Sequence, residues 1–503
     1  MSVEGFRHVT IEVECDTAAE RAALWQYVFA SMERYRAGLD HSSAAGELDP
    51  QGARDLLAAI DFIEPMLPRE AVALVLNGLS RQVHATHPRH FGLFVPAPST
   101  VAVVAETLAA TFNPQLATRE HSPYAVEAEK HVLEAMARRF GFPAEHTAAT
   151  FTSGGAEANH TAMLCALNWR DRRVMTDGVA VLGAAPVVYV TRDTHPTVAR
   201  AVRMCGLGDA AVREIPLDGS LRMDVTAAAE QVSRDRRAGR LPLMIVATAG
   251  TTSSGAVDPL ADLGRLARQT GMWLHVDGAW GGAAALLPEM SSVFDGLEQA
   301  DSFSLDAHKW LAFPLGMGMF FTRHKRLLTQ TFRVVAPYLN TIQIDDPEPY
   351  EQSMQWSRRF SGLKLLLVLL VMGWSGYETL LRHHVQLGNG LRARLIERGW
   401  RIDNPAAVLP VVCFSDPNAV TEIEDEYHER LARAVVASGQ AWLTTTLVGS
   451  RRVLRACVTS AHTQERDIDI LADTLDAVRQ GTHADRSTSP FCIDAGKRVL
   501  SGL

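Results

Sequence analysis

The sequence predicts an α/β fold: a mostly parallel sheet of seven strands with helices on both faces. Between residues 111 and 375, short apolar segments alternate with longer helical patterns, which is typical of parallel strands joined by helices. The 503 residues, 47% of them hydrophobic, are enough for a large buried core. The expected strands are 147–152, 186–191, 211–216, 243–249, 272–277, 301–305 and 317–322.

Two smaller parts flank this sheet. Residues 1–110 form an N-terminal helical segment, with helices expected over 17–36 and 51–83. Residues 111–375 form the large domain, in which 156–172 and 258–270 are expected helices. Residues 376–503 form a small α+β domain. Its expected elements are the helix 386–398, strands near 408–414 and 453–458, and a last helix 465–479.

Bulk properties narrow the class of function. A net charge of −8 argues against a nucleic-acid partner. Six scattered cysteines without a CxxC pair suit a reducing compartment, so we expect a cytoplasmic protein. The longest apolar run, 365–374, is too short to span a bilayer and is expected to form a buried helix, so no membrane association is predicted.

Lys309 stands in the segment Asp-Ser-Phe-Ser-Leu-Asp-Ala-His-Lys-Trp-Leu, residues 301–311. An apolar strand, a histidine and a tryptophan are unusual neighbours for a solvated charge. Burial would lower the pKa of the lysine and leave a neutral amine, which can form a Schiff base with an aldehyde. This segment alone agrees equally well with a lysine whose charged end reaches solvent from a strand end.

Asp277 ends the apolar strand 272–277 and is followed by Gly278 and Ala279. Ligands of open parallel sheets bind beyond the carboxyl ends of the strands. A carboxylate at such an end suits pyridoxal phosphate (PLP), because it keeps the pyridine nitrogen protonated, and small neighbours let the ring approach the backbone. Asp277 alone could equally cap the next helix, but the candidate Schiff-base lysine further along favours the cofactor.

Three more segments offer cofactor contacts. The turn Ser153-Gly154-Gly155 precedes a helix expected to begin near Ala156, whose free N–H groups and positive dipole end suit a phosphate. His195 and Thr248 each follow an expected strand, where the imidazole could stack on a ring and the hydroxyl could reach the ring oxygen. The same sequence patterns also occur in strand–helix turns that bind nothing, in histidines that cap helices and in threonines of ordinary turns.

Together these segments resemble the group II PLP-dependent amino-acid decarboxylases, over residues 80–480. The Asp-x-His-Lys-Trp and His-Val-Asp-x-Ala blocks are the most specific parts. The resemblance implies the type I fold of PLP enzymes (aspartate aminotransferase-like). It also implies that Lys309 holds the cofactor as an internal aldimine and that Asp277 pairs with the pyridinium. Further contacts implied by the resemblance are Ala279 and His195 on the two ring faces, Gly155 and Ala156 at the phosphate, Thr248 near the ring and His308 beside the lysine.

The implied reaction is decarboxylation of an L-amino acid to the amine and carbon dioxide, through an external aldimine and a quinonoid. In the family, a tyrosine on a mobile loop then protonates Cα. The matching region, 328–356, contains Tyr338 and Tyr350, and Tyr350 is the nearer match because it shortly precedes Arg358. Relatives without that tyrosine tend toward oxidative deamination. The alternatives are therefore an aldehyde synthase or carbon–carbon lyase on the same fold, or a catalytically silent subunit.

The resemblance also implies a homodimer with the active site at the subunit interface, because the family's N-terminal helices wrap around a partner. Residues 112–118 match the region where the partner lines the substrate pocket. Gln115 there favours a substrate that forms hydrogen bonds, whereas Phe91 and Phe94 are compatible with a substrate that has an aromatic side chain. Aromatic, imidazole and longer aliphatic or polar substrates all remain open, and acidic substrates are less favoured because no arginine can be assigned to them.

Two positions depart from the family pattern, and one cluster suggests metal. Asp306 stands where several relatives carry asparagine near the phosphate, so we expect its carboxylate to bond backbone N–H groups or His308. Gly278 replaces a more usual alanine and is expected to loosen the turn. The spacing of the histidines at 84, 87 and 90 resembles a metal site, but acidic and cysteine ligands are missing nearby, so no metal is predicted.

Overall fold

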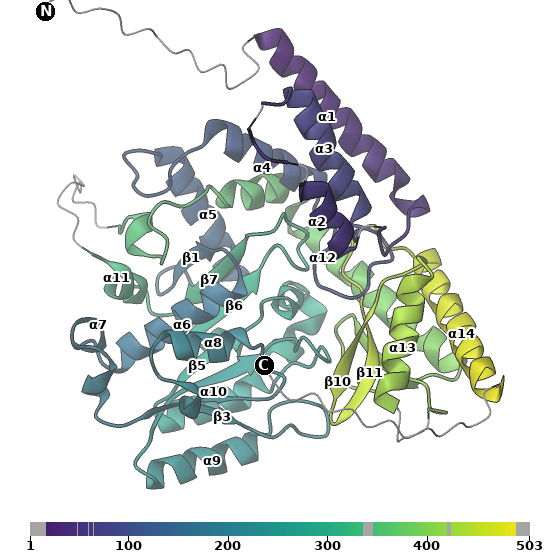
Figure 1. Ribbon diagram of the computed structural model, residues 1–503. Coiled ribbons are helices and arrows are strands. Elements are labelled where there is room, and N and C mark those ends of the chain that lie inside the picture. The colour runs from purple at the N-terminus through teal and green to yellow at the C-terminus, as the bar shows by residue number, and fades with distance from the viewer. Residues whose placement is uncertain are drawn as a thin grey trace, which may run out of the picture.

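The computed structural model describes residues 17–47, 49–58, 60–63, 65–334, 346–419 and 424–488. Its central element is a seven-stranded sheet in the order β1-β7-β6-β5-β4-β2-β3 (Figure 1). β7 alone runs opposite to the other six strands, so the predicted mostly parallel sheet is confirmed. The strands are β1 (Ala148–Thr152), β2 (Pro186–Val190), β3 (Val212–Glu214), β4 (Leu241–Thr248), β5 (Trp273–Asp277), β6 (Ser302–Asp306) and β7 (Gly318–Thr322).

Each face of the sheet is covered by helices, because successive strand residues point to opposite sides. In β4, Ile245 and Ala247 join one apolar core while Met244 and Val246 join another. The first core is completed by α5 (Pro123–Arg139), α9 (Val225–Arg237), α10 (Leu260–Thr270) and part of α12 (Gly362–Glu397). The second is completed by α6 (Gly155–Arg170), α8 (Thr197–Met204) and α11 (Leu327–Phe332).

The N-terminal helices stand apart from the sheet, at the purple end of the chain in Figure 1. They are α1 (Ala18–Gly38), α2 (Pro50–Ala58) and α3 (Pro68–Arg81), followed by α4 (Thr100–Phe112), which packs on α12. The prediction of one continuous helix over 51–83 is wrong, since α2 ends at Ala58 and α3 begins at Pro68. Proline lacks the N–H that a continuing helix needs and favours a first helical position, so Pro65 and Pro68 separate the two helices.

The C-terminal part has a four-stranded antiparallel sheet in the order β10-β11-β9-β8. Its elements are β8 (Arg401–Ile402), β9 (Val411–Ser415), α13 (Glu424–Ala437), β10 (Thr444–Val448), β11 (Arg451–Cys457) and α14 (Glu465–Thr488). The expected helix 386–398 is not a separate element but the end of α12. This long helix kinks at Gly373, where φ is +61°, and so joins the two sheets across the expected domain boundary.

The apolar run 365–374 lies in α12 and is buried on one side only. Leu365 and Val368 are buried, whereas Leu370 and Val371 keep 73% and 63% of their surface exposed. The predicted helix is confirmed, but its burial holds for one face only. By length and composition α12 could cross a membrane, but core helices of soluble proteins pass the same test.

Candidate active site

A row of polar side chains lies on the face of the sheet that α6 covers. Strand alternation places every second residue of β5 and β6 on this face, and the two strands pair with His275 opposite Ser302 and Asp277 opposite Ser304. The row ends at the carboxyl edge of the sheet, where parallel sheets bind ligands. It consists of Trp273, His275 and Asp277 on β5 and Ser302, Ser304 and Asp306 on β6.

Asp277 is held at this edge by three donors. Its Oδ1 accepts the Ala279 N–H at 3.0 Å and the Ser304 hydroxyl at 3.4 Å, and its Oδ2 accepts the Asn159 amide at 2.9 Å. Burial raises the pKa of Asp277, but His275, Lys309 and the hydrogen bonds together hold this pKa below its ordinary value. Asp277 is therefore a buried carboxylate that is charged at neutral pH, as a partner for a pyridinium must be.

Lys309 follows β6 and reaches the same edge. Its Nζ lies 3.0 Å from Asp306 Oδ2, and its side chain keeps 25% of its surface exposed. Of the two interpretations left open by the sequence, the structure agrees with the lysine whose charged end stays partly exposed, and this amine pairs with a carboxylate. We expected the Asp306 carboxylate to bond backbone N–H groups or His308. Its nearest partner is Lys309, and His308 Nε2 lies 3.8 Å from the same oxygen.

The Gly154–Gly155 turn brings the start of α6 against these residues. A Cβ added to Gly155 would lie 3.1 Å from Asp306 Oδ2 and 3.3 Å from Ala279 Cβ, so only glycine fits without displacing them. α6 begins at Gly155, one residue before the expected Ala156. The first N–H groups of a helix have no partner within it, and they favour an anion at this end.

Thr248 and His195 are the remaining residues that the sequence predicts at this site. Thr248 lies opposite Asp277 in the β4–β5 pairing, and its Oγ1 is buried without a hydrogen-bond partner among the described residues. A buried hydroxyl of this kind is normally satisfied, which points to a ligand group. His195 precedes α8; burial lowers the pKa of its imidazole, although Asp277 acts in the opposite direction.

These residues fit PLP. The charged Asp277 suits the ring nitrogen, the amine of Lys309 suits the aldehyde, and the start of α6 suits the phosphate. Sequence reasoning missed Asn159, which bonds to Asp277, and His275, which bonds to Asn159. The available signals were the place of His275 two residues before Asp277 on the same strand face, and the place of Asn159 one turn into the helix.

Gly278 has a packing role that the sequence did not show. A Cβ at this position would collide with the ring of Phe303 on β6. The expectation that Gly278 loosens the turn is therefore wrong, because the absent side chain makes room for a core aromatic.

Tyr350 lies in the short helix η7 (Pro349–Glu351) and is 3% exposed. Its backbone N–H donates to Ala117 O, and its ring packs on Trp356 at 4.6 Å between centroids. Tyr338, the alternative acid, lies outside the described residues. The structure thus places Tyr350 against the 112–118 segment.

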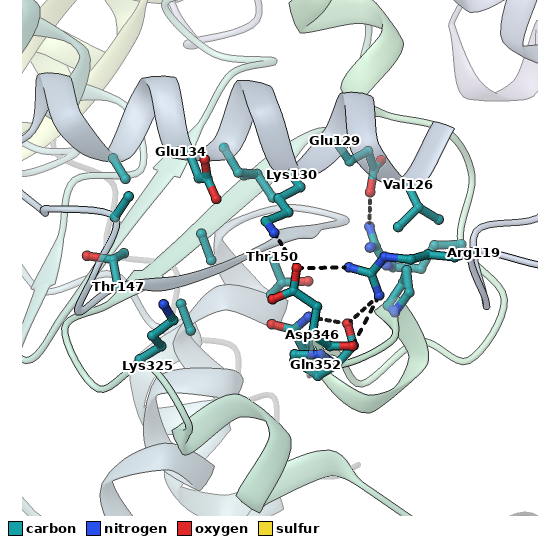
Figure 2. A pocket seen from close by; sticks show the side chains of 18 residues that line it. Arg119, Val126, Glu129, Lys130, Glu134, Thr147, Thr150, Lys325, Asp346 and Gln352 are labelled. Atoms are coloured by element: carbon teal, nitrogen blue, oxygen red, sulfur yellow. Dashed lines mark hydrogen bonds and ion pairs between the residues drawn. The ribbon is translucent and has the colours of Figure 1, made fainter. Parts of the chain in front are cut away.

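Figure 2 shows a cavity of about 160 Å³ between α5, the edge strand β1 and residues 346–358. Arg119 and Lys130 converge there on Asp346, and Arg119 also lies 3.5 Å from Glu348. These ion pairs fasten the chain immediately before Tyr350. The lining residues do not include the Asp277 and Lys309 group.

The histidines at 84, 87 and 90 are buried where the N-terminal segment meets the C-terminal sheet. His84 lies 3.2 Å from the Tyr35 hydroxyl, and His90 stacks on Trp442 at 4.6 Å. Over the described parts of the chain, no group of three or more His, Cys, Asp and Glu side chains is arranged to hold a metal ion.

Comparison with known proteins identifies the family. The model of the pyridoxal-dependent decarboxylase conserved domain matches residues 74–416. An aromatic-L-amino-acid decarboxylase from Bacillus atrophaeus is 31% identical over 409 residues, which cover 80% of this chain and 83% of the relative.

Solved structures share the fold. Oryza sativa TDC with PLP and tryptamine superposes with a TM-score of 0.88 at 24% identity, covering 93% of this chain and 99% of that one. Rhodiola rosea 4-hydroxyphenylacetaldehyde synthase superposes with a TM-score of 0.83 at 23% identity, with 93% and 99% coverage. The predicted type I fold and PLP cofactor are thereby confirmed, and the chain belongs to the pyridoxal-dependent decarboxylase family.

Proposed function

We propose that the protein removes the α-carboxylate of an L-amino acid as carbon dioxide and releases the corresponding amine. The observation that carries this proposal is that a charged, buried Asp277 and a partly exposed Lys309 follow two neighbouring parallel strands to the same edge of the sheet. Bound PLP supplies an aldehyde that condenses with amines and a ring that accepts electrons.

The protein's own residues then have separate tasks. Lys309 would hold the cofactor through its amine, and Asp306, 3.0 Å away, holds that amine in place. Asp277 would favour a proton on the ring nitrogen, and His195 and Ala279 would contact the ring. Gly155 and Ala156 would hold the phosphate end, and Thr248 Oγ1, which has no hydrogen-bond partner among the described residues, would gain one in the ring oxygen.

Tyr350 is the acid that we assign to Cα. Its backbone bond to Ala117 joins it to the segment that, by resemblance, lines the partner subunit's pocket. This contact supports a role for Tyr350 in the active site of the partner, with the Arg119 and Lys130 ion pairs as its anchor.

The functional unit that we propose is a homodimer. Apolar side chains on the N-terminal helices are largely uncovered: Trp25 is 49%, Phe29 51% and Phe112 80% exposed. Trp25 and Phe29 are neighbours on α1, and exposed apolar side chains that gather in this way are characteristic of protein–protein contacts. Sedimentation velocity should give a species of twice the chain mass; a monomer that retains full activity would contradict the proposal.

The first substrates to test are aromatic L-amino acids, because the curated relatives include decarboxylases of aromatic amino acids, of tryptophan and of tyrosine. Residues 87–94, which by resemblance to the family line the substrate entrance, include Phe91 and Phe94, and this keeps a flat aromatic substrate among the candidates. A panel of amino acids scored for amine formation decides between aromatic, imidazole and aliphatic substrates.

The central experiment is to locate the cofactor. Borohydride reduction of the holoenzyme should fix a pyridoxyl group on Lys309, which peptide mass spectrometry detects. Lys309→Ala should abolish turnover, whereas Lys325→Ala, a matched control from the other cavity, should keep it. Label on a different lysine, or full activity of Lys309→Ala, would refute the assignment.

The second candidate function is aldehyde synthesis by oxidative deamination. A synthase of this kind shares the fold, so the fold does not separate the two reactions. Amine and hydrogen peroxide measured in one reaction mixture do: amine without peroxide supports the decarboxylase, and aldehyde with stoichiometric peroxide supports the synthase.

A further inference from the structure

Asn159 lies in the second turn of α6 and is buried at 3% exposure. Its Nδ2 is 2.9 Å from Asp277 Oδ2 and 3.0 Å from Thr197 Oγ1. Its Oδ1 is 2.9 Å from His275 Nε2. The Asn159 side chain therefore bonds to two residues of β5 and to the first residue of α8.

The orientation of this amide follows from its neighbours. Asp277 is charged and can only accept hydrogen bonds, so the NH₂ group of Asn159 must face it. The carbonyl oxygen then faces His275, whose Nε2 must carry a proton to donate. Burial lowers the pKa of His275 to about 4, so the ring is neutral and its Nδ1 is unprotonated.

The far side of His275 agrees with this assignment. Its Nδ1 lies 2.8 Å from Ser302 Oγ, which can donate its hydroxyl proton to it. The same Ser302 oxygen accepts the Trp273 Nε1–H at 2.9 Å. Every N–H or O–H donor thus has an acceptor along the hydrogen-bonded series Trp273, Ser302, His275, Asn159 and Asp277.

The second branch of Asn159 reaches His195. Thr197 Oγ1 accepts one N–H of Asn159 and can therefore donate its own proton to His195 Nδ1, 2.8 Å away. The Thr197 backbone N–H lies 3.3 Å from the same Nδ1. Two donors converge on this nitrogen, so it must be unprotonated, and the ring proton sits on Nε2.

We propose that Asn159 is a positioning residue. It holds the side chains of Asp277 and His195 in fixed positions relative to each other and, through Thr197, fixes His195 as the Nε2–H tautomer. His275 is the donor that orients Asn159. The effect of Asn159 on cofactor binding rests on the proposed function. The predicted tautomers of His195 and His275 do not depend on that function. A hydrogen bond to the Asn159 carbonyl also polarises the amide and strengthens the bond that it donates to Asp277.

The decisive variants separate the two branches. Asn159→Ala removes both, while Thr197→Val removes only the His195 branch and Thr197→Ser restores it. His275→Leu removes the orienting donor, and His275→Gln keeps an N–H near the position of Nε2. Asn168→Ala is the matched control. It lies on the same helix, is equally buried and bonds a threonine hydroxyl, that of Thr331, at 2.9 Å.

The first readout is ¹⁵N NMR of the imidazoles in the apoprotein, assigned with His195→Asn and His275→Gln. We expect both rings as neutral Nε2–H tautomers in the wild-type chain and in Asn168→Ala. Thr197→Val keeps the longer backbone N–H bond to His195 Nδ1 but loses the hydroxyl donor at 2.8 Å, so it should shift His195 toward a mixture of tautomers. Asn159→Ala, which frees the Thr197 hydroxyl to turn away, should do the same, and Thr197→Ser should restore the wild-type tautomer. An Nδ1–H tautomer for either wild-type ring, or an unchanged His195 in Thr197→Val, would overturn the proposal.

The second readout is binding of PLP to the apoprotein, together with the ¹⁵N shift of the labelled pyridine nitrogen. We expect Asn159→Ala and His275→Leu to weaken binding by about 10- to 100-fold and to move the shift toward the unprotonated form. His275→Gln should stay near wild type. Wild-type affinity in Asn159→Ala refutes the positioning role, as does an equal loss in Asn168→Ala. If the wild-type chain takes up no PLP, the proposed function fails, while the tautomers still decide the inference.

Discussion

Replacement of Asp277 by asparagine tests the most important electrostatic contact of the site. The new side chain has the same shape, and its Oδ1 can still accept the Ala279 N–H at 3.0 Å. Its NH₂ group, however, would face the NH₂ of Asn159, where the carboxylate now accepts a bond of 2.9 Å. The variant also loses the charge that keeps the ring nitrogen protonated.

The expected magnitude follows from the bonds that are lost. A hydrogen bond between charged groups contributes about 1.5–3 kcal/mol. At about 1.4 kcal/mol for each factor of ten, the loss corresponds to about 10- to 150-fold weaker PLP binding. Because the same charge would also stabilise the electron-accepting form of the bound ring, we expect kcat to fall further, by about 10²- to 10³-fold.

Titration of the apoprotein with PLP and assays of amine formation at saturating PLP measure the two effects separately. Asp235→Asn is the matched control, because Asp235 is also buried but bonds Tyr189 and Arg213 away from the site. An Asp277→Asn enzyme with the PLP affinity and kcat of the wild type would refute the proposed role of the carboxylate.

Four further predictions concern separate parts of the molecule. Tyr350→Phe should raise the ratio of peroxide to amine by about tenfold or more, because Cα loses its acid; an unchanged ratio would exclude Tyr350. Gly155→Val should weaken PLP binding in an equilibrium dialysis assay and lower apoprotein stability by about 1–3 kcal/mol, because its Cβ crowds two neighbours. Arg358→Met should cost about 3–5 kcal/mol in urea unfolding, because it leaves the buried Glu129 without its 2.8 Å ion pair. His275 has a pKa of about 4 when folded and 6.5 when unfolded, so the unfolded state binds more protons between these values and stability falls as the pH drops through them. The difference between these two pKa values corresponds to about 3 kcal/mol in the free energy of unfolding. Between pH 7 and pH 4.5, the free energy of unfolding of His275→Gln should therefore fall less steeply than that of the wild type.

The sheet was predictable because its strands are short apolar segments, each bounded by turns and separated by helical patterns. All seven expected strands occur, in order, as β1 to β7. The N-terminal helix 51–83 was not predictable in the same way, because helical periodicity continues across Pro65 and Pro68 while the backbone does not. The helix expected at 386–398 merged into α12 because a single kinked residue, Gly373, replaced an expected break.

The sequence by itself determined which chemical groups stand at strand ends: Lys309, Asp277, His195 and Thr248 follow strands whose carboxyl ends meet at one edge, and the glycine turn precedes a helix. Only the tertiary structure decided how they are held. Asn159 and Asp277 are 118 residues apart, and their bond depends on how α6 packs on β5. The pairing of Asp306 with Lys309 depends on side-chain directions at the end of β6. Strand alternation is local and can be read from residues two apart, whereas register between strands and the seating of a helix arise from contacts between distant segments.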